Sequence, residues 1–129
     1  MAIFPIVIDA CVLINAPVRD TLLRAAEYDL LRVHWSNSIL EETERNLINK
    51  RKVPADKARK LIRQLNLAFP EALIEVPAKL INAMPNAAKD RHVAATAVVA
   101  EAQVIITFDM DGFYTCRHTA SSHSILMNT

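Results

Sequence analysis

Glycine is almost missing from this chain, because Gly112 is the only one among its 129 residues. Antiparallel sandwiches and barrels need glycine in their many tight turns, so its scarcity argues against them and favours helices joined by short connections. Aromatic residues make up only 5% of the chain and hydrophobic residues 52%, so the core must be built from Ala, Val, Ile and Leu. This content excludes a disordered chain, and the length predicts one domain over residues 1–129.

The chain also lacks a charge excess, a metal-binding cysteine pattern and a long apolar run. Its 15 Lys and Arg nearly balance 14 Asp and Glu, so only a local basic rim could attract a nucleic acid. We interpret Cys11 and Cys116 as reduced thiols, with a disulfide as the less favoured alternative. No stretch is long enough to span a bilayer, and "MAIFPIVIDAC" lacks the features of a secretory signal. We therefore expect a cytoplasmic protein without a membrane segment.

Short apolar runs alternate with helical patterns along the chain. The strands are expected at residues 3–9, 32–35, 72–76 and 104–107. The helices are expected at 17–31, from a cap at Ser36 or Ser38 to residue 50, at 54–69 and at 87–102, with one or two turns at 77–84. The segment after Phe113 does not have the pattern of a closing strand. This alternation predicts an α/β fold, a three-layer sandwich with a central, mostly parallel sheet flanked by helices.

Acidic residues follow the first and last of these strands. Asp9 ends the run "IFPIVID", and Asp109 and Asp111 follow "VIIT". In parallel sheets, ligands bind beyond the carboxyl ends of the strands, although Asp9 has the alternative role of capping a following helix. The "DMDG" segment also resembles the nucleophile motif of haloacid-dehalogenase-like phosphatases. That fold places its motif in the first strand with a long domain after it, and too few residues remain here.

Two expected helices carry further candidate acids. Glu42 flanks the inward face of its helix, whereas Glu41 stands at capping-box spacing from Ser38. Asp90 lies at the start of an apolar helix, where an acid also interacts favourably with the helix dipole. Right-handed crossover geometry brings that helix start near the end of a preceding strand. Each acid taken alone therefore has a structural interpretation beside the functional one.

Four segments in order carry a family resemblance. Asp9 in "VIDACVLIN", Glu42 in "SNSILEETERNL", Asp90 in "AAKDRHVAATAVVAEAQ" and Asp109 in "VIITFDMDGF" resemble the motifs of PIN-domain ribonucleases. The similarity covers roughly residues 3 to 113 and is to the branch with bacterial VapC-type toxins. It implies a parallel sheet whose clustered acids bind Mg²⁺ or Mn²⁺ and cleave RNA. It also implies the toxin role in a type II toxin–antitoxin pair, with a cognate antitoxin and a homodimer as partners.

The resemblance also refines the choice of acids. Glu42 is preferred to Glu41 because the family's motif places its acid five residues before the leucine that matches Leu47. Asp109 sits where some relatives carry Asn, and Asp111 is an additional candidate metal ligand. The chemistry of the residues agrees, because carboxylates without His or Cys at ligand spacing suit Mg²⁺ or Mn²⁺ better than Zn²⁺.

A polyanionic substrate requires basic groups beside an acidic site. The candidates for RNA contact are Arg91, His92 and Arg45, together with the "KRK" run at 50–52, for which a solvated helix end is an equal alternative. Two other functions remain open. One is a non-catalytic PIN-like RNA-binding or scaffold module. The other is a receiver-like regulatory domain, although such domains pair their acids after the first strand and carry a late lysine, and here no lysine follows Lys89.

Overall fold

The computed structural model describes residues 4–86, 90–108 and 123–126 of the chain. Four strands of the described part, β1 (Phe4–Ile8), β2 (Leu31–His34), β3 (Val104–Thr107) and β4 (His123–Leu126), form one sheet in the order β2-β1-β3-β4. Every neighbouring pair is parallel. The helices are α1 (Ala10–Leu13), α2 (Ala16–Glu27), α3 (Asn37–Lys50), α4 (Ala55–Ala68), α5 (Ala78–Ala83) and α6 (Arg91–Ala100). The predicted α/β sandwich with a parallel sheet flanked by helices is confirmed.

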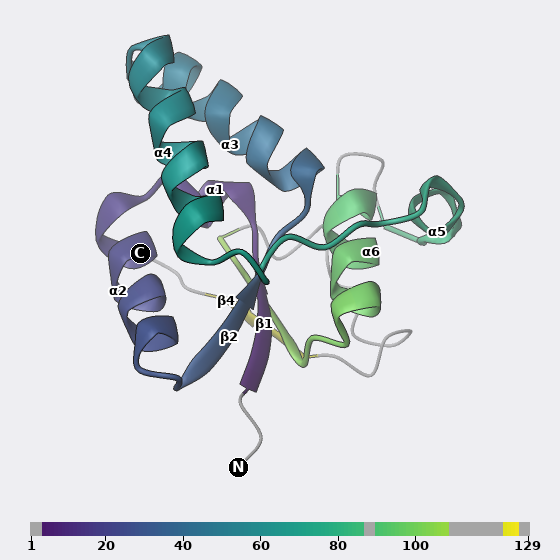
Figure 1. Cartoon of the computed structure of the whole chain (residues 1–129). Helices are drawn as coiled ribbons and strands as arrows, with labels where there is room; N and C mark the ends of the chain where they lie inside the picture. The colour runs from purple at the N-terminus through teal and green to yellow at the C-terminus, as the bar shows by residue number, and fades with distance from the viewer. Residues whose placement is uncertain (1–3, 87–89, 109–122, 127–129) are drawn as a thin grey trace.

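The helices form layers on the two sides of the sheet (Figure 1). Helix α2 packs against β2, and α6 packs against β1 and β3 on the other side. Helices α3 and α4 contact each other and extend away from the sheet as a pair (Figure 1). None of the helices in the described ranges is long and apolar enough to cross a membrane.

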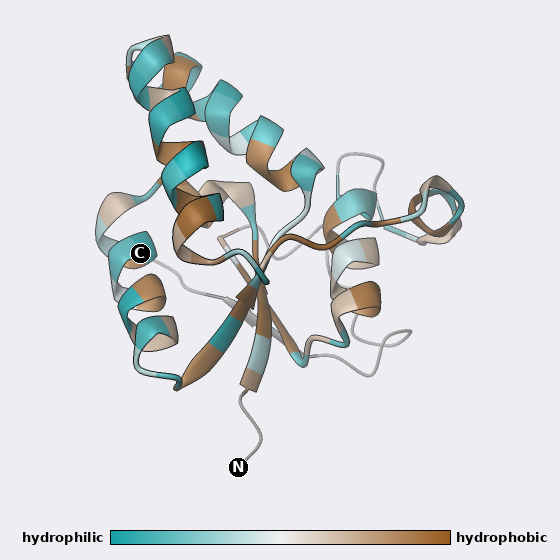
Figure 2. Ribbon diagram, viewed as in Figure 1, coloured by the Kyte–Doolittle hydropathy of each residue, from teal (hydrophilic) through white to brown (hydrophobic). Residues whose placement is uncertain are grey.

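Burial of β1 on both faces explains its unbroken apolar sequence. Ile6, Val7 and Ile8 are buried between the two helix layers, as expected for a central parallel strand. Trp35, just after β2, is also buried, and its ring meets Phe69 edge-on with centroids 6.1 Å apart. Figure 2 shows the same division, with hydrophobic residues along the strands and hydrophilic ones on the outer faces of α3 and α4.

The expected strand at 72–76 is wrong, because this segment forms only a single bridge between Trp35 and Leu73. The backbone N–H of Trp35 donates to the carbonyl of Ala72 at 3.0 Å, and Ile74 N–H donates to the carbonyl of Trp35 at 2.8 Å. The partner segment leaves the sheet directly after Trp35, because Ser36 already caps α3, so the pairing does not continue.

The expectation that no closing strand follows Phe113 is also wrong. Strand β4 pairs with β3 in parallel, from Val104 beside His123 to Thr107 beside Leu126. The side-chain pattern of this segment does not predict a strand, but a strand forms through backbone hydrogen bonds, which the outer edge of β3 provides.

The helix ends differ in several places from the sequence-based prediction. The helix expected at 17–31 ends at Glu27, because Asp29 takes a φ of 60°, outside the helical range, and Leu31 already belongs to β2. Ser36 caps α3, because its hydroxyl accepts from the N–H of Ile39 at 3.2 Å, and Ser38 lies inside the helix. The capping box between Ser38 and Glu41 is therefore wrong. The expected helix at 87–102 is confirmed from Arg91 to Ala100, and residues 87–89 lie outside the described ranges.

Candidate active site

Asp9 lies at the carboxyl end of the central strand, where the strand order reverses. The chain first places β2 on one side of β1 and later β3 on the other, and such a switch point opens a crevice for ligands. The N–H of Asp9 donates to the carbonyl of Ile106 at 3.1 Å, so its backbone is joined to β3. The residue is buried, with only 6% of its surface exposed.

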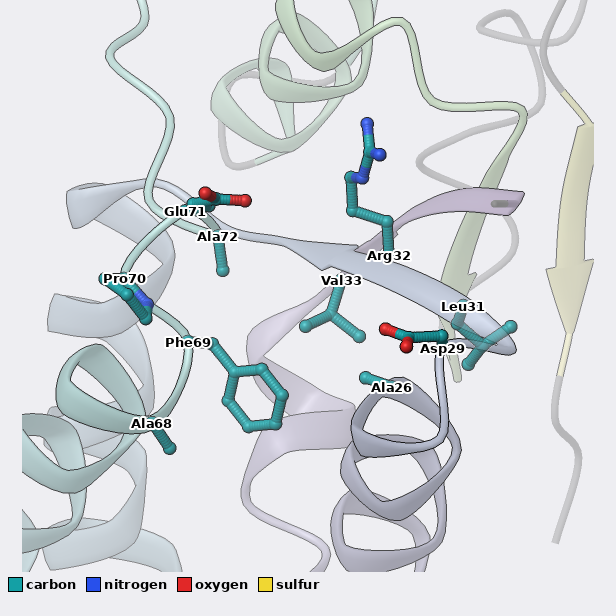
Figure 3. A pocket seen from close by; sticks show the side chains of 10 residues that line it. All are labelled: Ala26, Asp29, Leu31, Arg32, Val33, Ala68, Phe69, Pro70, Glu71 and Ala72. Atoms are coloured by element: carbon teal, nitrogen blue, oxygen red, sulfur yellow. The ribbon is translucent and has the colours of Figure 1, made fainter. Parts of the chain in front are cut away.

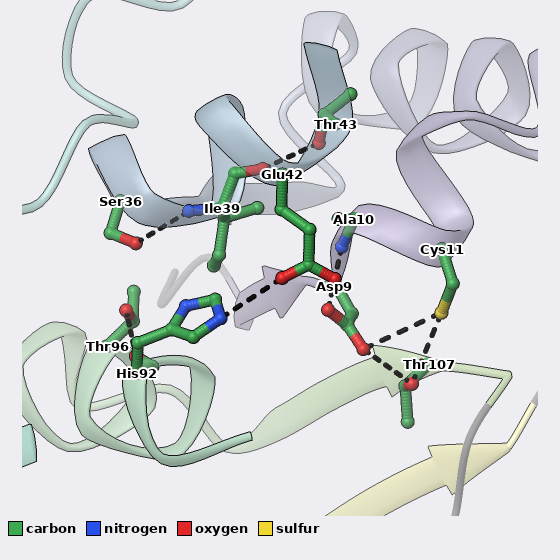
Figure 4. Close-up of polar contacts among 10 residues, drawn as sticks. All are labelled: Asp9, Ala10, Cys11, Ser36, Ile39, Glu42, Thr43, His92, Thr96 and Thr107. Carbon is green, nitrogen blue, oxygen red and sulfur yellow. Dashed lines mark hydrogen bonds and ion pairs between the residues drawn. The ribbon is translucent and has the colours of Figure 1, made fainter. Parts of the chain in front are cut away.

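Both oxygens of the Asp9 carboxylate accept hydrogen bonds (Figure 4). Oδ1 accepts from the N–H of Ala10 at 2.7 Å, which caps α1, and Oδ2 accepts from the hydroxyl of Thr107 at 2.9 Å. The capping role considered as an alternative is therefore real, but it occupies one oxygen only. Burial raises the pKa of Asp9, the nearby Glu42 carboxylate also raises it, and the two hydrogen bonds oppose this shift.

Glu42 reaches the same crevice from α3, next to Asp9 (Figure 4). Its Oε1 lies 3.2 Å from Nε2 of His92 in the first turn of α6. This hydrogen bond lowers the pKa of Glu42, partial burial opposes the shift, and the charge of Arg45 assists it. Glu41 is exposed and lines a different groove on α3, with Glu44 and Arg45 among its neighbours. The geometry therefore favours Glu42 over Glu41 as the partner of Asp9.

Two supports of Asp9 were missed by the sequence analysis. Cys11 Sγ lies 3.5 Å from Asp9 Oδ2 and 3.5 Å from the hydroxyl of Thr107, and it accepts from the N–H of Phe108 at 3.4 Å. Burial raises the pKa of this thiol, and the Asp9 charge adds to the effect, so Cys11 is a neutral donor beside the carboxylate. The sequence does place Thr107 at the end of an apolar strand. Its position beside Asp9 depends on the pairing of Ile106 with Ile8, and this register cannot be read from the sequence.

The structure describes only some of the remaining predicted residues. Asp90 precedes α6, two residues before His92, and is buried with 7% exposure. Arg91 donates from Nε to the carbonyl of Asn86 at 3.0 Å, while Arg45 and the 50–52 run are exposed on and after α3. Asp109 and Asp111 lie outside the described residues.

The described ranges contain no group of three or more His, Cys, Asp or Glu side chains that could hold a metal ion. What they contain is a pair, Asp9 and Glu42, whose hard oxygen donors come from separate elements. Carboxylate oxygens are the ligands that Mg²⁺ prefers, and Mg²⁺ requires only one or two of them beside water and substrate. This pair therefore fits a divalent cation.

A separate hollow at the outer edge of β2 does not have this chemistry (Figure 3). It encloses about 250 Å³ between β2, α2 and the end of α4. Its lining combines apolar side chains with the charged residues Asp29, Arg32 and Glu71, and it contains none of the predicted site residues. The hollow also lies beside the body of an edge strand, whereas the acids gather at the carboxyl end of the central one.

Comparison with protein families agrees with this geometry. The family model described as PIN domain matches residues 5–111, a range that includes Asp9, Glu42, Asp90, Asp109 and Asp111. No curated protein matches the chain. PIN domains are usually nucleases and typically bind divalent metals. Because the match covers most of a chain whose parallel sheet carries a carboxylate pair at its switch point, this chain belongs to the PIN-domain family.

Proposed function

We propose that this PIN domain is a metal-dependent endoribonuclease that hydrolyses phosphodiester bonds of RNA. The observation that carries the proposal is the juxtaposition of Asp9 and Glu42 at the β1–β3 switch point (Figure 4). Two carboxylates repel each other when both are ionised, and burial of Asp9 increases the cost. A bound cation offsets this repulsion, so the pair is suited to a metal ion.

The residues proposed to hold Mg²⁺ or Mn²⁺ are Asp9, Glu42, Asp90 and Asp109, with Asp111 as an additional ligand. When bound, such an ion lowers the pKa of a coordinated water and stabilises the leaving oxygen of the phosphodiester. The chain itself orients the ligands. Thr107 and the N–H of Ala10 fix both oxygens of Asp9. Arg45 and Arg91, exposed and partly exposed on α3 and α6, are the residues that we propose to contact RNA phosphates.

An RNA cleavage assay tests this function. We expect a purified chain to cleave RNA internally with Mg²⁺ or Mn²⁺ and to lose all cleavage when EDTA removes the metal. A single-stranded DNA of the same sequence serves as the comparison substrate. Cleavage that persists in EDTA would contradict metal dependence. If the chain binds RNA but cleaves it with neither Mg²⁺ nor Mn²⁺, the alternative of a non-catalytic PIN-like RNA-binding or scaffold module is favoured.

We further propose that the ribonuclease acts in the cytoplasm as the toxin of a type II toxin–antitoxin pair, as a homodimer controlled by a cognate antitoxin. The support is the resemblance of its four acidic segments to the VapC-type branch. We expect a small neighbouring gene that encodes a DNA-binding protein. Co-expression of this gene should restore the growth of cells that produce the chain. If cells that produce the active enzyme grow normally without the product of any neighbouring gene, the toxin role is contradicted.

Arg91 provides a test of the substrate contact. Its Nε donates a hydrogen bond to the backbone carbonyl of Asn86. This bond holds the arginine at the start of α6, next to Asp90. We expect Arg91→Ala to weaken RNA binding and to reduce the slope of log affinity against log salt by about one phosphate contact, that is by roughly 0.7 to 0.9. Filter binding over a range of salt concentrations measures this slope. Arg91→Lys is the control that keeps the charge, and an unchanged slope in the alanine variant would exclude a phosphate contact.

A further inference from the structure

The contact between His92 and Glu42 joins two helices at the mouth of the candidate site. Nε2 of His92, on α6, lies 3.2 Å from Oε1 of Glu42, on α3. The His92 side chain is 16% exposed and that of Glu42 is 32% exposed. A ring with so little free surface is poorly placed to stack on a base or to bind a phosphate, so its main contact is with Glu42.

The other ring nitrogen indicates which tautomer is present. Nδ1 of His92 is buried, and no described residue offers it a hydrogen-bond partner. A proton on Nδ1 would be a buried donor without an acceptor, which costs about 1–3 kcal/mol. A carboxylate oxygen can only accept, so the contact with Glu42 Oε1 is a hydrogen bond when Nε2 carries a proton, and the unpartnered Nδ1 favours that tautomer.

The backbone of His92 is fixed within α6, which gives its ring a defined starting point. The hydroxyl of Thr96 donates to the carbonyl of His92 at 2.6 Å, and the next residues along α6, Val93 and Ala94, are buried in the core. Glu42, by contrast, has a long side chain with several rotatable bonds. The second carboxylate oxygen of Glu42 lies on the side of Asp9 (Figure 4).

We propose that His92 is a positioning residue, which holds one oxygen of Glu42 by a hydrogen bond so that the other faces the metal site beside Asp9. This inference rests on the proposed function and replaces the expected contact of His92 with RNA. Hydrogen bonds that orient metal ligands typically change metal affinity by about 10- to 100-fold when they are removed.

Two amide variants separate the hydrogen bond from the presence of a polar side chain. Glutamine places its amide nitrogen where histidine has Nε2, so His92→Gln keeps a donor toward Glu42. Asparagine places its amide nitrogen where histidine has Nδ1, so in His92→Asn this nitrogen is too far from Glu42 to donate a hydrogen bond. Mn²⁺ binding to the whole chain without RNA, followed by the electron paramagnetic resonance signal of free Mn²⁺, measures the affinity directly. Circular dichroism verifies the fold of each variant.

We expect His92→Asn to weaken Mn²⁺ binding by about 10- to 100-fold and His92→Gln to stay within a few-fold of the wild type. In the cleavage assay at saturating metal, KM for RNA should be unchanged in both variants. Unchanged Mn²⁺ affinity in His92→Asn, an equal loss in both variants, or a raised KM with normal Mn²⁺ affinity would each overturn the proposal. If His92→Asn does not fold, the glutamine variant decides, and a loss above about tenfold overturns the proposal.

The experiment also separates this inference from the proposed function. A wild-type chain that binds Mn²⁺ but cleaves no RNA would overturn the nuclease proposal, while the comparison of Mn²⁺ affinities would still decide the role of His92. A wild-type chain that binds no Mn²⁺ would overturn both.

Discussion

Replacing Asp9 with Asn is expected to abolish Mg²⁺-dependent RNA cleavage and to make the metal-free protein more stable. Asparagine keeps an oxygen for the N–H of Ala10 and a polar group beside Thr107, so the local structure should survive. It removes the buried charge that a cation requires. Asp90→Asn is expected to abolish cleavage in the same way, because Asp90 belongs to the same proposed set of ligands.

The stability gain should depend on pH in a defined direction. Burial, with a contribution from Glu42, raises the pKa of Asp9 above its ordinary value of 3.8. A carboxyl group with a raised pKa stabilises the fold while it is protonated, and this contribution disappears as pH rises from 3.8 through the folded-state pKa. We therefore expect Asp9→Asn to gain about 0.5–2 kcal/mol at neutral pH and much less near the ordinary pKa.

Urea unfolding in EDTA, at neutral and at acidic pH, measures this difference between wild type and variant. Added Mg²⁺ should stabilise the wild-type chain and leave the variant unaffected. A variant that cleaves RNA at the wild-type rate under matched Mg²⁺ would show that Asp9 is not a metal ligand. A variant less stable than wild type at neutral pH would show that the capping bond outweighs the buried charge.

Glu42→Gln and Glu41→Gln are expected to differ sharply although the two residues are adjacent. Glu42 is half-buried beside Asp9 and bonded to His92, so its neutralisation should reduce cleavage to the background rate. Glu41 is exposed in another groove, and its substitution should leave cleavage within about twofold and stability within about 0.5 kcal/mol of wild type.

Initial rates of RNA cleavage at several Mg²⁺ concentrations compare the two variants. Each variant loses one negative charge from α3, so a general effect of charge on RNA attraction would appear equally in both. Equal activities in the two variants would therefore exclude a specific role for Glu42. Loss of activity in Glu41→Gln alone would reverse the assignment.

The sequence predicted the parts of the fold that depend on local pattern. The apolar run before Asp9 predicted a strand covered on both faces, and the Ala- and Val-rich segment after Asp90 predicted a buried helix, as β1 and α6 confirm. The order of the acids predicted the family, which the match over residues 5–111 supports. Parallel strands share one carboxyl edge, so acids that follow such strands are predicted at that edge from the sequence alone.

The predictions that were wrong concern elements whose formation depends on pairing between distant segments. Residues 72–76 look like a strand, but Trp35 gives them only one bridge, and β4 forms in a polar segment because β3 offers an open edge. The hydrogen bonds of Thr107 to Asp9 and of His92 to Glu42 require the register of two strands and the packing of two helices. Side-chain composition carries no information about either.

The candidate site is built from residues that are far apart along the chain. The bond from Thr107 to Asp9 spans 98 positions, and the contact between His92 and Glu42 spans 50. During synthesis Asp9 emerges 98 positions before Thr107, so its support arrives only with β3. Such long-range contacts form late in folding, because the intervening chain must be ordered first. A nascent chain that still lacks β3 therefore has no assembled site, so the proposed nuclease would not act on the messenger or the ribosome that produces it before β3 has been made.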